Sequence, residues 1–126
     1  MKKIDVPWLG LGQQIWFNIG RIKRVEGLLK KPISEVAREM TGLNITNLIV
    51  LLQVGNIHNG MKSEQYYEDI IQEALDSGVS IREIYSDTLK AVIASGVLGD
   101  EIYYQIFPEE MIEETQKNLQ GATMPE

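Results

Sequence analysis

The chain has 126 residues, of which 44% are hydrophobic and none is cysteine. This length suits a single domain with a hydrophobic core, and the lack of cysteine excludes disulfides, thiolate zinc sites and cysteine nucleophiles. The net charge is −6, and it is unevenly distributed along the chain.

Residues 1–38 carry eight basic and three acidic side chains, a net charge of +5. Residues 39–126 carry four basic and fifteen acidic side chains, a net charge of −11, and the two parts sum to −6. Two interpretations follow. Either the basic part packs on the acidic remainder, within one molecule or between copies, or the segment RIKRVEGLLKK meets an acidic partner.

Residues 1–12 are rich in Gly and Pro and predict an irregular N-terminal arm. Their basic start imitates a signal peptide, but the polar residues that follow leave no apolar core, so we expect an unprocessed cytoplasmic protein. Residues 13–17, QQIWF, predict a strand or an extended docking segment.

Two helices are predicted next. Asn18 is the expected N-cap of the first, and Pro32 suits the first turn of the second, ISEVAREM, which ends at Gly42. The apolar residues of the first helix recur at helical spacing, with the basic residues opposite them. These apolar residues are Ile19, Ile22, Val25, Leu28 and Leu29.

Residues 41–61 contain no charged side chain, although 24% of the chain is charged. They predict a helix that begins at Asn44 or Ile45 and lies in a core or an interface. Polar residues interrupt it too often for a membrane span, which needs about 18 nearly continuous apolar residues. The order of residues 34–52 resembles a helix-turn-helix, but without a basic residue the second helix is not expected to bind nucleic acid.

Two further helices are predicted, one beginning at Ser63 and one at Ser80. In the second, Ser80 and Glu83 form a capping box, in which the serine hydroxyl accepts from the backbone N–H of Glu83. The apolar stripe of the first comprises Tyr66, Tyr67, Ile70, Ile71, Ala74 and Leu75. The stripe of the second comprises Ile81, Ile84, Tyr85, Thr88, Leu89 and Val92.

Residues 98–107 predict a short connector or a helical turn, and Pro108 opens a last amphipathic helix with Met111, Ile112, Thr115 and Leu119 on one side. The predicted fold is all-α: a compact bundle of about five or six short helices with one short N-terminal extended segment. A single helical domain is expected over residues 13–119, followed by a disordered tail over residues 120–126.

No catalytic, cofactor or metal site is predicted. His58 is the only histidine and lies in a turn without metal-ligand spacing, so a hydrogen-bonded structural or solvent-facing role is expected. Paired carboxylates such as Glu113 and Glu114 fall on polar helix faces, where they are solvated rather than held in an apolar pocket.

The apolar and glycine positions follow an order that resembles the small tail assembly chaperones of long-tailed phages and prophages, of the gene-transfer-agent type. The resemblance covers roughly residues 14–107. The positions that carry it are Lys30-Lys31-Pro32-Ile33, Leu48, Leu51, Leu52, Gly55, Ile57, His58, Leu75 and Gly78.

The resemblance implies a non-enzymatic holdase without cofactors. It would bind the tape-measure protein, assist the tail-tube protein and be absent from the finished virion, and self-association into a homo-oligomer is also expected. Neither nucleic acid nor a membrane is an expected partner. The alternative is a head–tail connector or tail-completion protein that stays in the virion.

Partner contacts are expected from apolar and aromatic surface on the helices over residues 46–58 and 63–77, helped by the basic segment 21–31. The predicted partner-binding residues are Trp16, Arg21, Lys23, Arg24, Leu48, Leu52, Tyr66, Tyr67, Tyr103 and Tyr104.

Overall fold

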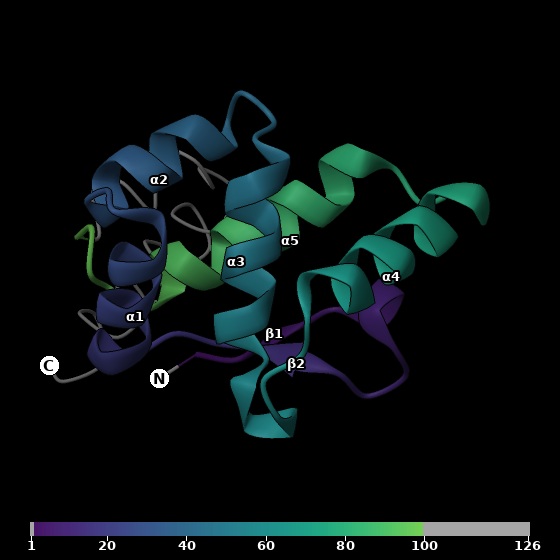
Figure 1. The fold of residues 1–126 in the computed structure, drawn as a ribbon, viewed down its shortest axis with the longest axis horizontal. Helices are drawn as coiled ribbons and strands as arrows, with labels where there is room; N and C mark the ends of the chain where they lie inside the picture. Colours follow the sequence, from purple (N-terminus) through teal and green to yellow (C-terminus); the bar gives the residue numbers. More distant parts are fainter. Residues whose placement is uncertain (1, 100–126) are drawn as a thin grey trace, which may run out of the picture.

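The computed structural model describes residues 2–99. Five α-helices and one two-stranded antiparallel sheet make up this part, which confirms the predicted all-α class and its short extended segment. The predicted helix over residues 108–119 and the predicted tail lie outside the described residues. The elements are β1 (Ile4–Asp5), a 3-10 helix η1 (Pro7–Leu9), β2 (Gln14–Ile15), α1 (Ile19–Leu29), α2 (Ile33–Met40), α3 (Ile45–Gly55), a 3-10 helix η2 (Ile57–Asn59), α4 (Glu64–Asp76) and α5 (Ile81–Ala94) (Figure 1).

Helix α3 is the centre of the fold. It packs against α1, α2, α4 and α5, and Figure 1 shows it standing between α1 and α2 on one side and α4 on the other. Every residue from 47 to 55 is buried. Over residues 47–56 the lack of charge is therefore explained by the core, because a helix surrounded on all sides has no face on which a charged side chain reaches water.

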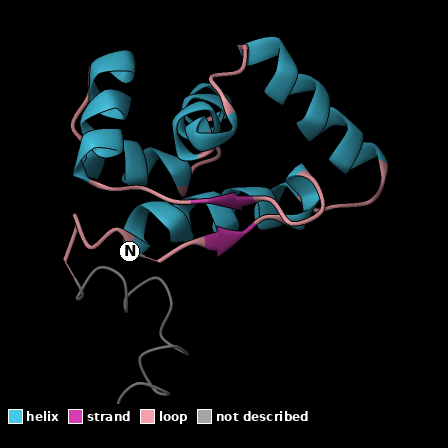
Figure 2. Ribbon diagram, turned by 90° about the horizontal axis from the view of Figure 1, so that it is seen from below, coloured by secondary structure: helices cyan, strands magenta, loops and turns pink. Residues whose placement is uncertain are grey.

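The N-terminal segment belongs to the core, which differs from the irregular arm that its composition predicts. Ile4 pairs with Ile15 across the sheet, and Figure 2 shows the two strands side by side, with a helix behind them. Val6 has no exposed surface, and its backbone N–H donates to the carbonyl of Gln13 at 3.0 Å. Strands of two residues are too short to show an alternating pattern, so the sequence carried no sign of this pairing.

The helix starts follow the predicted caps, with one correction. The side chains of Asn18, Asn44 and Ser63 each accept a hydrogen bond from the backbone N–H three residues later. At α5 the hydroxyl of Ser80 accepts instead from the N–H of Arg82, at 3.2 Å. Ser80 is therefore the N-cap, but the bond to Glu83 expected for a capping box does not form.

The predicted stripe of α5 is buried, apart from a half-buried Ile81. On α4 the buried face is narrower than predicted, since Tyr67, Ile71 and Ala74 are buried while Tyr66 and Leu75 are exposed. Helix α4 lies on the outside of the bundle, where a neighbour covers only one side of it. Ile70 is partly buried against the core, whereas Tyr66 and Leu75 face solvent.

Candidate partner-binding surface

Three of the predicted partner-binding residues lie in the core. Leu48, Leu52 and Tyr67 have no exposed surface. Tyr67 is further held by a hydrogen bond from the side-chain amide of Asn56 to its hydroxyl, at 3.2 Å. In this fold these three side chains hold the bundle together and cannot contact a partner, because their apolar faces are fully used within the chain.

Trp16 and Arg21 are brought together at the C-terminal end of α3. The guanidinium carbon of Arg21 lies 3.2 Å from the centroid of the Trp16 ring. Its Nη1 donates to the carbonyl of Gly55 at 3.0 Å and contacts Nδ1 of His58 at 3.2 Å. Arg21 thus caps the end of α3, where carbonyls lack helical partners, and gains a cation–π contact with Trp16.

His58 completes this cluster. Its ring stacks on Trp16 with 5.6 Å between centroids. Because a guanidinium only donates, Nδ1 of His58 must accept, so the neutral ring carries its proton on Nε2. Burial and the positive charge of Arg21 both lower the pKa of His58. The cluster therefore favours the neutral form of His58. Its polar groups bind one another and the end of α3, so the cluster has a structural role.

The other predicted residues are dispersed. Lys23 and Arg24 are exposed on the outward side of α1. Tyr66 is exposed on α4, with its ring edge-on to Tyr67 and the ammonium of Lys62 5.7 Å from its centroid. Tyr103 and Tyr104 lie outside the described residues. Of the predicted set, the structure brings together Trp16 with Arg21 and Tyr66 with Tyr67, and it does not unite these pairs in one site.

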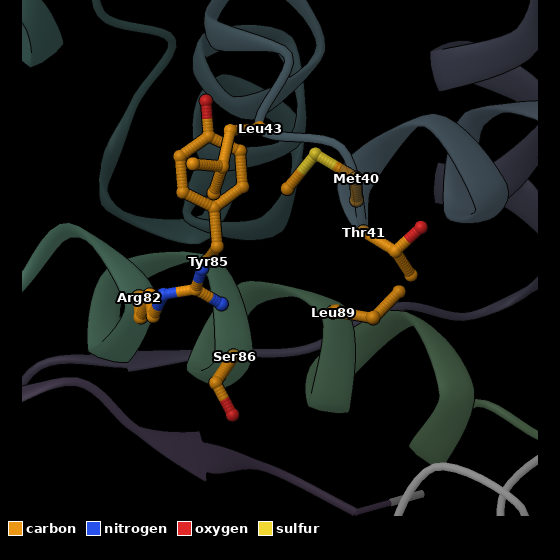
Figure 3. Close-up of a pocket in the computed structure, with 7 residues that line it drawn as sticks. All are labelled: Met40, Thr41, Leu43, Arg82, Tyr85, Ser86 and Leu89. Atoms are coloured by element: carbon orange, nitrogen blue, oxygen red, sulfur yellow. The ribbon is translucent and has the colours of Figure 1, made fainter.

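An open cleft lies between the turn that joins α2 to α3 and the first half of α5. Its volume is about 150 Å³. Figure 3 shows the side chains of Met40 and Leu43 facing those of Tyr85 and Leu89. The lining residues are Met40, Thr41, Leu43, Arg82, Tyr85, Ser86 and Leu89.

The lining of the cleft combines apolar and polar side chains. Met40, Tyr85 and Leu89 are buried, whereas Arg82 and Ser86 are exposed. Leu43 keeps 42% of its surface exposed and has a φ of +62°, a left-handed conformation that leucine rarely adopts. The turn therefore holds a large apolar side chain beside the opening at a cost in backbone energy.

None of the lining residues was predicted to bind a partner. The cleft combines residues 40–43 with residues 82–89, so it depends on a contact between α2 and α5 that no local pattern reveals. The one local signal is the sequence Gly42-Leu43-Asn44, in which an apolar residue stands between two typical turn residues.

A second hollow, of about 310 Å³, separates η1 from α4. Beside it, the indole N–H of Trp8 donates to a carboxylate oxygen of Asp87 at 2.9 Å, so Trp8 serves to join the N-terminal segment to α5. Glu73 and Ser77 contribute polar groups to the lining. This hollow is larger than the first cleft, and its lining includes the buried side chains of Leu9 and Ala74.

Over residues 2–99, no cluster of three or more His, Cys, Asp or Glu side chains is arranged to hold a metal ion. No helix in the same range is long and apolar enough to cross a membrane. Comparison with known proteins finds no matching family model, no matching curated protein and no matching solved structure.

Proposed function

We propose that this chain is a non-enzymatic tail assembly chaperone of a long-tailed phage or prophage. In the cytoplasm of the bacterial host it binds amphipathic helices of the tape-measure protein and assists assembly of the tail tube around it. The observation that carries this proposal is the open cleft between the α2–α3 turn and α5, where Met40, Leu43, Tyr85 and Leu89 provide apolar surface. The order of apolar and glycine positions over residues 14–107 supports it.

The size of the cleft favours a side chain over a metabolite. Typical small-molecule pockets have volumes of roughly 300–1,000 Å³, and this cleft has about 150 Å³. A helix that binds in a groove inserts one or two apolar side chains at helical spacing. The cleft suits such an insertion, with Leu43 beside its opening as added apolar surface.

The chemistry of the lining favours a partner with repeated, varied helices. Only 2% of the surface of Met40 is exposed, so Met40 would have to move to admit an inserted side chain, and its unbranched, flexible side chain suits such repacking. Arg82 at the edge is available to pair with an acidic residue flanking the inserted side chain. A long amphipathic protein such as a tape measure presents this combination many times.

Co-expression with the tape-measure protein of the same phage tests the proposal. We expect the tape-measure protein to be soluble and to copurify with this chain. Ser86→Trp places a large ring in the cleft and should abolish copurification, whereas Ser34→Trp, on an exposed position of α2 outside the cleft, should not. A tape-measure protein that is equally soluble and equally unbound with and without the chain would contradict the proposal.

The composition of purified phage particles separates the proposal from its alternative. A chaperone is absent from the finished particle, so we expect mass spectrometry to detect no copies of this chain there. Its presence at a fixed number of copies per particle would instead assign it to the connector or tail-completion class.

A further inference from the structure

The hydroxyl of Tyr85 is a buried polar group without a partner, and it belongs to a residue that lines the cleft. Tyr85 keeps 4% of its surface exposed, and within the described residues its hydroxyl oxygen makes no hydrogen bond. Most buried polar side-chain atoms in proteins have a partner, and an unpaired one destabilises the fold. Phenylalanine would fill the same space without this cost, so the packing of the bundle does not explain the hydroxyl.

Leu43 is the second unfavourable feature of the same cleft. Its φ of +62° is a strained conformation for leucine, and its backbone N–H reaches the carbonyl of Met40 only at 3.4 Å. Figure 3 shows the ring of Tyr85 extending from α5 toward the α2–α3 turn, with the hydroxyl at the end where Leu43 lies. Two locally unfavourable groups therefore meet at one opening, and such features concentrate at functional sites.

The polar side chains of the cleft offer hydrogen-bond donors. Arg82, Tyr85 and Ser86 are three and four residues apart on α5, so they share one face of the helix. A guanidinium only donates, and the hydroxyls of tyrosine and serine can both donate. No aspartate or glutamate lines the cleft. This lining suits an occupant that brings an oxygen acceptor, and the charge of Arg82 favours a carboxylate.

An amphipathic helix can bring a carboxylate and an apolar side chain to one cleft. Residues four apart in a helix lie side by side on the same face. A leucine and a glutamate at this spacing therefore present an apolar group and a carboxylate together. The carboxylate can accept a charge-assisted hydrogen bond from the Tyr85 hydroxyl, which is stronger than a bond between neutral groups.

The Tyr85 hydroxyl is buried, so an occupant reaches it only if a residue of the cleft moves. Leu43 is the candidate, because 42% of its surface is exposed and its conformation is strained. Movement of Leu43 relieves that strain, and the apolar side chain of the occupant replaces the contacts that Leu43 gives up.

We propose that the cleft selects helices with a glutamate one turn from the inserted apolar side chain, and that Tyr85 is the specificity-determining residue. Its hydroxyl donates to the glutamate carboxylate once Leu43 moves aside, and Arg82 supplies a second donor. This inference rests on the proposed binding of helices in the cleft, and it adds the group that decides which helices bind.

Two synthetic helical peptides test the proposal by titration of the full chain. They are identical except at one position, four residues after a central leucine, where one has glutamate and the other has leucine. The parent chain should bind the glutamate peptide at least about thirtyfold more tightly, because an unpaired buried hydroxyl gains a charged acceptor. Tyr85→Phe should reduce this preference about tenfold. Tyr66→Phe, at an exposed tyrosine on α4, should retain it.

A merely structural role of Tyr85 would not change the preference between the two peptides. Urea unfolding checks that Tyr85→Phe remains at least as stable as the parent chain, so that lost preference is not lost folding. Amide NMR signals recorded during the titration locate the contact. The glutamate peptide should shift the signals of residues 41–43 and 82–89 most.

Four results would overturn the proposal: no binding of the glutamate peptide, equal binding of both peptides, an unchanged preference in Tyr85→Phe, or shifts confined to other residues. Self-association of the chain that Tyr85→Phe abolishes would assign the hydroxyl to a second copy and would also overturn it. Copurification of the tape-measure protein is independent of these peptides. A chain that copurifies with it but shows no glutamate preference loses this inference alone, and the reverse result contradicts only the proposed function.

Discussion

The ring of Phe17 packs directly on the backbone of Gly55. A Cβ atom added at Gly55 would lie 2.9 Å from Cζ of Phe17 and 3.3 Å from Cβ of Ile15. Phe17 and Ile15 are both buried, so neither has free space into which to move. This contact joins the N-terminal segment to the end of the central helix, and it accounts for a glycine at a position where the backbone itself does not require one.

Gly55→Ala should therefore destabilise the protein. Overpacking of a buried site costs roughly 1–3 kcal/mol, which outweighs the gain of up to about 1 kcal/mol from better helix propensity. Urea denaturation followed by circular dichroism measures the change. Gly27→Ala is the matched control, since its added Cβ meets nothing within 4 Å, and it should stabilise by about 0.5–1 kcal/mol. Equal effects of the two substitutions would show that Phe17 does not restrict Gly55.

Two buried tyrosines should respond in opposite ways to loss of the hydroxyl. The hydroxyl of Tyr67 accepts from Asn56, whereas that of Tyr85 is buried without a hydrogen-bond partner within the described residues. Tyr67→Phe leaves a buried amide hydrogen unpaired and should cost about 1–2 kcal/mol. Tyr85→Phe removes an unpaired polar group and should leave the free energy of unfolding unchanged or raise it by up to about 1 kcal/mol.

The measurement is the difference between these two variants in thermal and urea unfolding. Burial raises the pKa of both hydroxyls, so both remain neutral at pH 7 and charge does not complicate the comparison. A Tyr85→Phe variant as destabilised as Tyr67→Phe would show that the Tyr85 hydroxyl has a partner, and the description of the cleft would need revision.

The N-terminal segment should contribute to stability as a part of the core. Val6→Ala removes buried methyl groups and should destabilise by roughly 1–3 kcal/mol. Leu11→Ala is the control in the same segment, because Leu11 is fully exposed and its loss should change stability by less than about 0.5 kcal/mol. If Val6→Ala behaved like Leu11→Ala, residues 1–12 would be an arm, as their composition predicts.

The free energy of unfolding should decrease as the pH is lowered, because of the single histidine, His58. The pKa of His58 lies below its ordinary value of 6.5, mainly because of burial and secondly because of Arg21. A lowered folded-state pKa means that the unfolded chain binds the proton more readily. The contribution of neutral His58 to the free energy of unfolding is therefore fully present above pH 6.5. It is lost as the pH falls from 6.5 through the folded-state pKa.

Urea midpoints measured between about pH 7.5 and pH 5.5 test this dependence. Protonation gives Nδ1 a hydrogen, which ends its contact with Arg21. The midpoint of the parent chain should fall across this range, and that of His58→Gln should stay flat. The pKa of Glu39 is also lowered, because its carboxylate pairs with Lys31 at 2.8 Å. This pair changes the pH dependence of stability only near and below pH 4.5, the ordinary pKa of the group, and so outside the range from about pH 7.5 to 5.5. A parent midpoint that is flat from pH 7.5 to 5.5 would contradict the role assigned to His58.

Local features of the fold were predictable from sequence because they depend on neighbours in the chain. The caps at Asn18, Asn44 and Ser63 each involve a backbone group three residues away. The stripe on α5, from Ile81 to Val92, repeats over about three turns, which makes its helical period clear. The lack of charge over residues 41–61 predicted a core or an interface, and the structure places residues 47–55 in the core.

Features that depend on distant contacts were not predictable. Tyr66 and Tyr67 are adjacent and chemically identical, and only the position of the neighbouring helices decides that Tyr67 is buried while Tyr66 is exposed. The cleft depends in the same way on the contact between the turn at Leu43 and α5. Predicting partner contacts from apolar residues therefore selected Leu48 and Leu52, whose apolar character serves the core.

Binding of amphipathic tape-measure segments to the cleft is the central claim, and isothermal titration of the full chain with such segments tests it most directly. Ser86→Trp should weaken the affinity at least about tenfold, equivalent to about 1.4 kcal/mol, because the introduced ring occupies the space that the partner's side chain needs. Ser34→Trp should retain the affinity of the parent chain. A parent chain that binds no segment, or a Ser86→Trp variant that binds as tightly as Ser34→Trp, would contradict the claim.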